Sequence, residues 1–322
     1  MRAPLGLISH LFSMVHFDSD EVYRGLGGEW NDVKHVERPS WLSQVVDAAD
    51  QGGATLECDV VVVGTGAGGA VVGRELAARG HAVLFVEQGR RHTREEFDGR
   101  SIEAHFRFYR PALTLGNAPM PVMMGRMLGG STAINGGSCY RTPASVLARW
   151  CEDLGTSAFS EARMRPYFER VERTIEVAPA APRTVGPFAE ALARGCDALG
   201  YAHGPVLRNA PGCDGAGFCD FGCRTGARRS MDVSYVPLAA QHGAVVLTGL
   251  RADAVAIENG AAVGLEATVL ATGERLRVRA RRVVLACGGS TRRRSCCARA
   301  SPTRAARSAA TSRCSRAAAS RR

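Results

Sequence analysis

A short apolar run that leads directly into a glycine-rich turn constrains the fold of this chain more than any other feature. Residues 58–63 read CDVVVV, and residues 64–69 read GTGAGG, which fits the pattern G-x-G-x-x-G. Four consecutive valines are too apolar for a surface strand, so we expect a buried parallel strand. The following residues, 70–79, are typical of a helix, and Gly80 is suited to end it.

A second apolar strand is predicted at residues 82–86, and it ends at Glu87, eighteen residues after the last motif glycine. Strand, turn, helix, strand and acid in this order are typical of a dinucleotide-binding βαβ unit. In such a unit Gly64 permits the tight turn, Gly66 lets the backbone approach a pyrophosphate, and Gly69 lets the helix pack on the strand. The helix N-terminus faces the anion, and Glu87 accepts hydrogen bonds from a ribose hydroxyl. The residues predicted to bind the cofactor here are Gly64, Thr65, Gly66, Ala67, Gly69 and Glu87. This unit alone does not distinguish FAD from NAD.

A second glycine-rich segment makes that distinction. Residues 125–137 read GRMLGGSTAINGG, which resembles the signature of the glucose-methanol-choline (GMC) oxidoreductases, a segment that lies along FAD. Glycines at 129 and 130 allow a close backbone turn, and the short polar side chains that follow supply hydrogen bonds. The resemblance implies FAD as the cofactor, with Gly129, Gly130, Ser131 and Asn135 on the flavin side of the site.

The resemblance continues along the chain. Residues 150–154 and 165–172 are similar to a family segment that leads into the substrate domain. Residues 222–230, GCRTGARRS, resemble a stretch of bacterial members related to long-chain alcohol and sterol oxidases, with Arg228 in place of the usual lysine. Residues 283–289, VVLACGG, match the end of the FAD domain. The resemblance therefore spans roughly residues 50–289.

We predict an α/β fold, in which a Rossmann-like FAD-binding domain carries a β-meander and an incomplete substrate-binding domain is attached. Parallel strands are expected near 58–63, 82–87, 244–248 and 282–286. The meander, residues 254–280, would form a second layer with turns at Asn259-Gly260 and Thr272-Gly273. The FAD-binding domain is expected in two stretches, 56–154 and 231–289, on either side of a partial substrate domain (155–230). An N-terminal extension (1–55) would precede them, and a disordered basic tail (290–322) would follow.

The net charge of +10 is confined to the tail. Residues 290–322 contain ten arginines and no acid, so the 31 other Lys and Arg balance the 31 Asp and Glu. A neutral body has no general field that attracts phosphate backbones, so no nucleic-acid partner is predicted. No apolar run is long enough to span a membrane, and the first residues lack a cleavage-site pattern, which favours a cytoplasmic enzyme.

Three cysteines follow one another closely in the second half of the chain. Cys213, Cys219 and Cys223 fit C-x5-C-x3-C, one ligand short of a four-cysteine cluster, and His203 stands at an unusual ligand spacing. We therefore favour a packed loop with buried thiols over a metal site, and no metal is predicted. The isolated cysteines elsewhere are typical of thiols in a reducing compartment.

Residues 290–322 use only Arg, Ala, Ser, Thr, Cys and Pro. They bury too little surface to offset their ordering entropy, so disorder is expected. Shifting the reading frame by one base across Cys296-Cys297 yields apolar codons like those of the family's continuation. We therefore hypothesise a frameshift near Gly289 or Ser290, natural or a sequencing error.

The family oxidises alcohols with a C-terminal histidine as base. None of the eight histidines follows Gly289, so no catalytic residue is assigned. The sequence predicts an FAD-dependent oxidoreductase that acts on CH–OH groups of alcohol or sterol-like substrates, here truncated and without the catalytic histidine. The alternative is a non-catalytic flavin-binding or partner-binding fragment with a basic tail.

Overall fold

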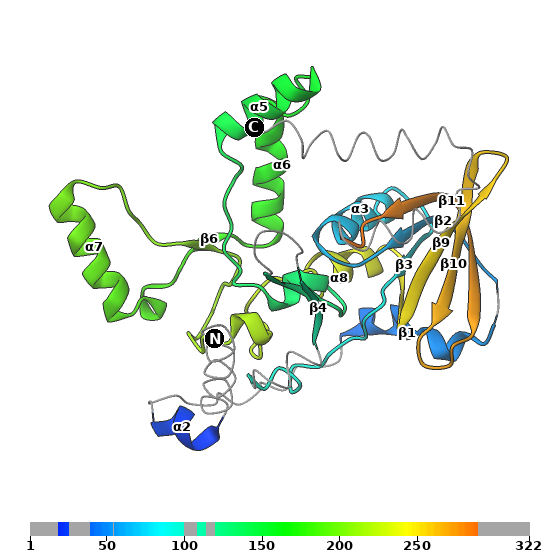
Figure 1. Cartoon of the computed structure of the whole chain (residues 1–322), viewed down its shortest axis with the longest axis horizontal. Coiled ribbons are helices and arrows are strands. Elements are labelled where there is room, and N and C mark those ends of the chain that lie inside the picture. The colour runs from blue at the N-terminus through cyan, green and yellow to red at the C-terminus, as the bar shows by residue number, and fades with distance from the viewer. Residues whose placement is uncertain (1–18, 26–38, 54, 100–107, 114–119, 289–322) are drawn as a thin grey trace, which may run out of the picture.

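The computed structural model describes residues 19–25, 39–53, 55–99, 108–113 and 120–288. At its centre lies a seven-stranded sheet with the strand order β1-β8-β3-β2-β11-β10-β9 (Figure 1). Neighbouring strands from β1 to β11 in this order are parallel, and β11, β10 and β9 are antiparallel. The strands are β1 (Val45–Asp47), β2 (Leu56–Val63), β3 (Val83–Val86), β8 (Val245–Thr248), β9 (Leu250–Glu258), β10 (Ala261–Val269) and β11 (Arg275–Leu285). The predicted α/β class and parallel strands are confirmed.

Strand β2 lies in the middle of the parallel region, between β3 and β11, and its valines at 60–63 are all buried. Alternate side chains of a strand point to opposite faces. Val60 and Val62 pack in the cluster that contains residues of helices α3 (Ala67–Ala77) and α8 (Tyr235–Ala240), whereas Val61 and Val63 pack against the meander. The apolar run is therefore continuous because both faces of β2 are covered.

Helix α3 begins three residues earlier than predicted, with Gly66 as its N-cap. Gly80, which follows the helix, has a φ of 84°. That is the left-handed conformation in which glycine commonly ends helices. The turn predicted at Gly80 is therefore confirmed, while the helix starts three residues earlier and ends two residues earlier, at Ala77, than predicted.

The meander differs in one respect from the prediction. Its side chains do pack on the face of the parallel strands opposite α3, as a second layer would. However, the predicted last meander strand and the closing strand at 282–286 are one continuous strand, β11, which pairs with both β10 and β2. The prediction of two separate strands was wrong, because β11 runs without a break from a half in which exposed arginines alternate with buried residues into a half that ends in partly buried apolar residues. The meander is thus hydrogen-bonded into the main sheet.

The segment before residue 55 takes part in the sheet. Strand β1 lies within the expected N-terminal extension, yet it pairs in parallel with β8, with Val45 opposite Val246. This segment therefore forms the edge of the sheet. The predicted tail, residues 290–322, lies outside the described residues.

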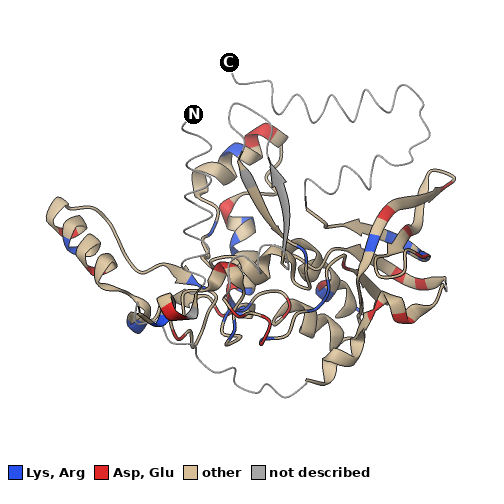
Figure 2. Ribbon diagram, turned by 60° about the horizontal axis from the view of Figure 1, so that its bottom comes forward, with Lys and Arg blue, Asp and Glu red and all other residues tan. Residues whose placement is uncertain are grey.

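Three helices extend away from the sheet: α5 (Ala144–Leu154), α6 (Glu161–Thr174) and α7 (Pro187–Leu199) (Figure 1). The other short elements are α2 (Asp20–Gly25), the ribbons β4 (Tyr109–Leu113) with β5 (Pro121–Gly125) and β6 (Ala178–Pro179) with β7 (Leu207–Arg208), and the 3-10 helices η1 (Ser40–Gln44), η2 (Ala48–Gln51), η3 (Gly130–Ile134), η4 (Pro182–Thr184) and η5 (Cys219–Phe221). Acidic and basic side chains are interspersed along the described chain (Figure 2). None of the described helices has the length and apolar character needed to cross a membrane.

Candidate functional site

A cavity of about 470 Å³ lies where the parallel strands β2, β3 and β11 end. Ligands of open α/β sheets bind outside the carboxyl ends of the strands. The predicted cofactor-binding residues that line it are Gly64, Gly66, Ala67, Glu87, Gly130, Ser131 and Asn135. Three further predicted residues, Thr65, Gly69 and Gly129, do not line the cavity but lie directly behind its wall. The structure thus brings the two glycine-rich motifs and the acid to one place.

Thr65 joins the three predicted motifs. Its side chain is fully buried, and its Oγ1 donates a hydrogen bond to Glu87 Oε2 over 2.7 Å, while its backbone N–H donates to the same oxygen over 3.0 Å. The N–H of Gly129 in turn donates to Thr65 Oγ1 over 2.9 Å. Thr65 therefore acts behind the cavity wall, where it connects the turn after β2, the end of β3 and the signature segment.

Glu87 directly follows β3, and its carboxylate is held by hydrogen bonds from the protein. Its Oε1 accepts a hydrogen bond from the Gly89 N–H over 2.9 Å, in addition to the bonds from Thr65 to Oε2. Burial raises the pKa of the Glu87 carboxyl, and these hydrogen bonds oppose that effect by favouring the charged form. The side chain is preorganised on the cavity lining, at the position predicted for a ribose contact.

The amino end of α3 faces this cavity with no acidic side chain in its first turn. The unpaired N–H groups and the helix dipole make such an end a favourable place for an anion.

Two glycines of the first motif, Gly66 and Gly69, differ in their surroundings. A Cβ on Gly69 would lie 2.0 Å from the Gly64 carbonyl oxygen, whereas a Cβ on Gly66 would meet no atom of the described residues within 4 Å. Close packing requires Gly69, while the protein itself gives no steric reason for Gly66.

The signature segment wraps around the other side of the cavity. Gly129 and Gly130 have φ values of 88° and 55°, and a Cβ on Gly130 would lie 3.1 Å from the Cα of Gly66. Ser131 Oγ accepts a hydrogen bond from the Gly125 N–H over 3.0 Å, and Asn135 Oδ1 accepts one from the Gly137 N–H over 3.0 Å. The polar side chains that were predicted to face the flavin therefore also fix the shape of their own loop.

Several residues on the cavity lining were not assigned to the site by sequence reasoning: Gln88, Met124, Arg126, Leu250, Ala252, Cys287 and Gly288. Arg126 and Glu87 are the charged residues of the described lining. Arg126 lies within the signature segment 125–137, so the sequence did indicate that it lies near the cofactor. Leu250 and Ala252 come from β9, and only the pairing of the sheet brings them to the cavity.

The three clustered cysteines line a separate small cavity of about 40 Å³. The Nη2 of Arg208 donates to Cys219 Sγ over 3.0 Å, and the backbone N–H of Arg228 donates to Cys223 Sγ over 3.3 Å. Within the described stretches of the chain, no group of three or more His, Cys, Asp or Glu side chains is arranged to hold a metal ion. All three cysteines are partly buried, and the sulfur atoms of Cys219 and Cys223 accept these hydrogen bonds from arginine donors.

Solved structures with a similar fold include pyridoxine 4-oxidase from Mesorbium loti, with a TM-score of 0.58 and 18% identity over 72% of this chain and 49% of that one. Formate oxidase from Aspergillus oryzae follows, with a TM-score of 0.57 and 17% identity over 74% of this chain and 47% of that one. At these identities the likeness concerns the fold.

Sequence relatives are more similar. An uncharacterized GMC-type oxidoreductase of Mycobacterium tuberculosis is 34% identical over 257 residues, which cover 79% of this chain and 40% of the relative. A long-chain-alcohol oxidase of Arabidopsis thaliana is 32% identical over 200 residues, 62% of this chain and 27% of the relative. The chain thus spans less than half the length of these relatives.

The family model described as GMC oxidoreductase matches residues 53–292, close to the span of 50–289 predicted from the motifs. GMC oxidoreductases depend on FAD, so the prediction of FAD as the cofactor is confirmed. On this match, the chain belongs to the GMC oxidoreductase family.

Proposed function

We propose that the described residues form the FAD-binding half of an oxidoreductase that oxidises the CH–OH group of an alcohol. The observation that carries this proposal is the cavity that joins the α3 amino end, Glu87 and the signature segment. FAD, when bound, supplies the hydride acceptor. Since the chain spans less than half the length of its relatives, alcohol oxidation is proposed for a protein of the relatives' length.

The residues of the cavity fit the chemical groups of FAD. The first-turn N–H groups of α3, with Gly66 open beside them, suit the pyrophosphate, because backbone can approach the anion where no Cβ intervenes. The held carboxylate of Glu87 suits a ribose hydroxyl. The loop that carries Ser131 and Asn135 would lie beside the flavin, and its internal hydrogen bonds keep it in one shape.

We further propose that residues 155–230 belong to a substrate-binding domain. Helices α6 and α7 contain no buried residue along their described lengths, and large apolar side chains such as Phe188 (83% exposed) and Leu199 (70% exposed) lie on the surface of α7. The chain itself offers no histidine at the cofactor cavity as a base: none of the described histidines (His81, His92, His203 and His242) lines it. No catalytic base is therefore assigned to this chain, and alcohols such as the long-chain substrates named for the Arabidopsis relative remain the proposed substrate class.

The experiment has two separate readouts. Titration of the purified 322-residue chain with FAD and, in parallel, with NAD should show binding of FAD alone. A protein extended to the relatives' length should then bleach its oxidised-flavin absorbance under anaerobic conditions when primary alcohols of increasing chain length are added. Absence of FAD binding would contradict the cofactor assignment. FAD binding without bleaching by any alcohol, in the extended protein, would contradict the proposed reaction alone.

A further inference from the structure

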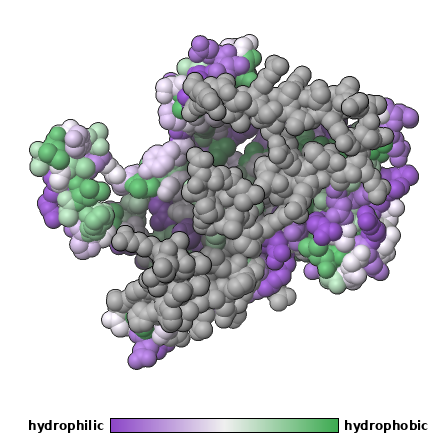
Figure 3. All heavy atoms as spheres, viewed as in Figure 1, coloured by the Kyte–Doolittle hydropathy of each residue, from purple (hydrophilic) through white to green (hydrophobic). Residues whose placement is uncertain are grey.

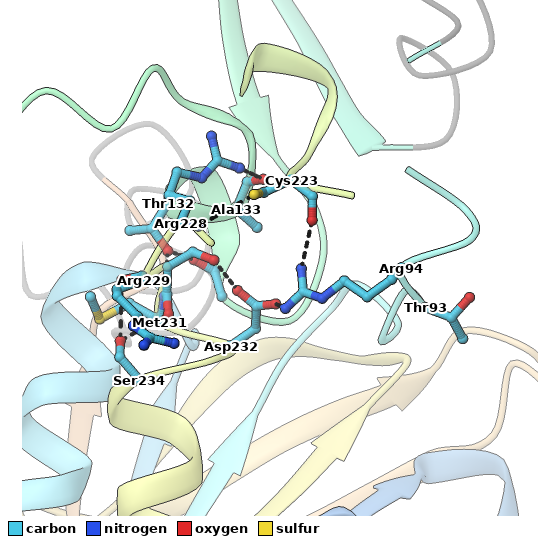
Figure 4. Close-up of polar contacts among 12 residues, drawn as sticks. Thr93, Arg94, Thr132, Ala133, Cys223, Arg228, Arg229, Met231, Asp232 and Ser234 are labelled. Atoms are coloured by element: carbon cyan, nitrogen blue, oxygen red, sulfur yellow. Dashed lines mark hydrogen bonds and ion pairs between the residues drawn. The ribbon is translucent and has the colours of Figure 1, made fainter. Parts of the chain in front are cut away.

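Arg228 is the largest side chain that is fully buried among the described residues, with 1% of its surface exposed. It belongs to the segment 222–230, GCRTGARRS. Its guanidinium donates hydrogen bonds to the backbone carbonyls of Ala133, Asn135 and, over 2.6 Å, Cys219. Two of these carbonyls belong to the signature segment, directly behind the residues that line the cofactor cavity. Figure 4 shows the side chain reaching from its own segment toward Ala133.

The charge of Arg228 has no carboxylate partner among the described residues. Asp232, whose charge acts on Arg228, forms an ion pair with Arg94 over 3.5 Å and accepts a hydrogen bond from the Ser230 hydroxyl. Burial lowers the pKa of the Arg228 guanidinium, yet arginine stays protonated in proteins. A buried cation costs free energy unless its donors are satisfied. Here two of the three carbonyls that accept hydrogen bonds from the guanidinium belong to the signature segment. The cation therefore needs the loop for its acceptors, and the loop needs the cation for its donors.

Neighbouring residues hold the same loop at further points. The Met231 N–H donates to Thr132 Oγ1 over 3.0 Å, and Thr132 Oγ1 donates to the Gly129 carbonyl over 2.6 Å (Figure 4). A Cβ on Gly129 would lie 3.0 Å from the backbone nitrogen of Asp232. Residues 228–232 therefore contact the loop from Gly129 to Asn135 along most of its length.

We propose that Arg228 is the positioning residue of the flavin-side loop: its guanidinium fixes the carbonyls of Ala133 and Asn135 before FAD binds. The proposal rests on the proposed function of the cavity. A loop that is already in its binding shape loses less conformational entropy when the ligand arrives, so affinity rises without a new contact. Without the cation, the two buried carbonyls lose their donors and the loop is free to relax.

The number of donors predicts which substitution preserves this role. A lysine ammonium has three N–H donors, which equals the number of carbonyls that Arg228 reaches. Arg228 also has a buried Nε with no hydrogen-bond partner among the described residues. Arg228→Lys should therefore keep the contacts to the loop, whereas Arg228→Met keeps the apolar stem and removes every donor.

The test compares Arg228→Lys, Arg228→Met and a control, Arg163→Met, which removes an exposed arginine of α6. FAD affinity is measured by titration of each apo-protein, and the visible circular dichroism of the bound flavin reports the shape of its site. We expect Arg228→Met to weaken FAD binding by about tenfold or more and to change the dichroism. Arg228→Lys and Arg163→Met should stay within about threefold of the parent chain and keep its dichroism.

Unfolding curves of the apo-proteins separate positioning from stability. Wild-type affinity and dichroism in a folded Arg228→Met variant would overturn the proposal. If Arg228→Met does not fold, Arg228→Lys decides: a folded Arg228→Lys variant that binds FAD as the parent does supports the proposal, and one that binds more than about tenfold weaker overturns it. If the parent chain itself binds no FAD, the proposed function fails first, and the two failures are thus distinguishable.

Discussion

The sheet and the three outlying helices are built in different ways. In the sheet, both faces of β2 are covered and side chains such as Val61, Val62 and Phe85 are completely buried. Among the described residues of α5, α6 and α7, Leu147 is the one that is buried, and apolar side chains lie on the surface. Figure 3 shows hydrophobic residues gathered on the exposed surface of α7.

This contrast indicates where the chain carries its own stability. The cofactor cavity lies against the sheet, so its walls are fixed by a packed core. The outlying helices have little core of their own, and helices of this length rely on tertiary packing for stability. We therefore expect substitutions of buried side chains in the sheet to change the free energy of unfolding strongly, and substitutions of exposed side chains in α7 to change it little.

The largest difference is expected between two phenylalanines. Phe85 of β3 has no exposed surface, and Phe188 of α7 is 83% exposed. Phe85→Ala should lower the free energy of unfolding by about 3–5 kcal/mol, whereas Phe188→Ala should change it by less than about 0.5 kcal/mol. Denaturant unfolding followed by far-UV circular dichroism measures both. Equal effects of the two substitutions would contradict the view that the sheet contributes more to stability than α7.

A somewhat smaller effect is expected at the start of α3. Gly69→Ala places a Cβ 2.0 Å from the Gly64 carbonyl oxygen, while the same change at Gly68 meets no described atom within 4 Å. Gly69→Ala should destabilise the protein by about 1–3 kcal/mol or more, since overpacking forces the backbone to shift. Gly68→Ala should leave stability unchanged or raise it by up to about 1 kcal/mol. Unfolding midpoints in urea compare the pair, and a tolerated Gly69→Ala would show that the helix can move away from the turn.

Thr65→Val tests the hydrogen bonds by which Thr65 connects Glu87 with the signature segment. The substitution removes the hydroxyl that donates to Glu87 and accepts from the Gly129 N–H, while it keeps the shape of the side chain. A buried N–H left without its acceptor costs about 1–3 kcal/mol, and we expect a loss of stability in this range. Thr174→Val is the control in the same denaturation assay: Thr174 is a half-buried residue of α6 whose hydroxyl donates to the Arg170 carbonyl of the same helix, and the substitution should be close to neutral. A neutral Thr65→Val would mean that the signature segment is held without this contact.

The smallest effect concerns the pH dependence of stability at Glu87. Burial raises the pKa of its carboxyl, so the fold favours the protonated form. The contribution of this group to stability is then fully present below the ordinary pKa and is lost as pH rises through the folded value. Relative to Glu87→Gln, which does not titrate, the parent apo-protein should gain stability as pH falls from about 8 to about 5. A difference that is independent of pH, or of opposite sign, would contradict the burial of a titrating carboxyl.

Local patterns predicted the features of the fold that depend on neighbouring residues. The apolar run before Gly64 predicted a strand covered on both faces, and all four of its valines are buried in the structure. The start of α3 was missed because its N-cap, Gly66, lies inside the turn motif itself. The continuous β11 was missed because its alternating arginine half and its apolar half differ in composition. A pattern of period two followed by an apolar run does not reveal that both belong to one strand.

Most of the residues that the motifs predicted for the site line one cavity, but their contacts with one another could not be predicted. Glu87 and the signature glycines belong to recognisable motifs. Their position at the carboxyl ends of the strands could therefore be expected of a parallel sheet. The position of Thr65 behind the wall and the arrival of Leu250 from β9 depend on the three-dimensional packing. The burial of Arg228 was equally unpredictable, since a polar loop sequence does not show which arginine faces inward.

The most direct test of the FAD cavity uses Gly66→Ala. No atom of the described residues lies within 4 Å of the added Cβ, and Gly66 lines the cavity with an ordinary negative φ of −68°. The substitution should therefore leave the unfolding curve of the apo-protein unchanged while it weakens FAD binding by about tenfold or more, as measured by flavin fluorescence titration. Unchanged FAD affinity in a folded Gly66→Ala variant would contradict the placement of the cofactor beside the amino end of α3.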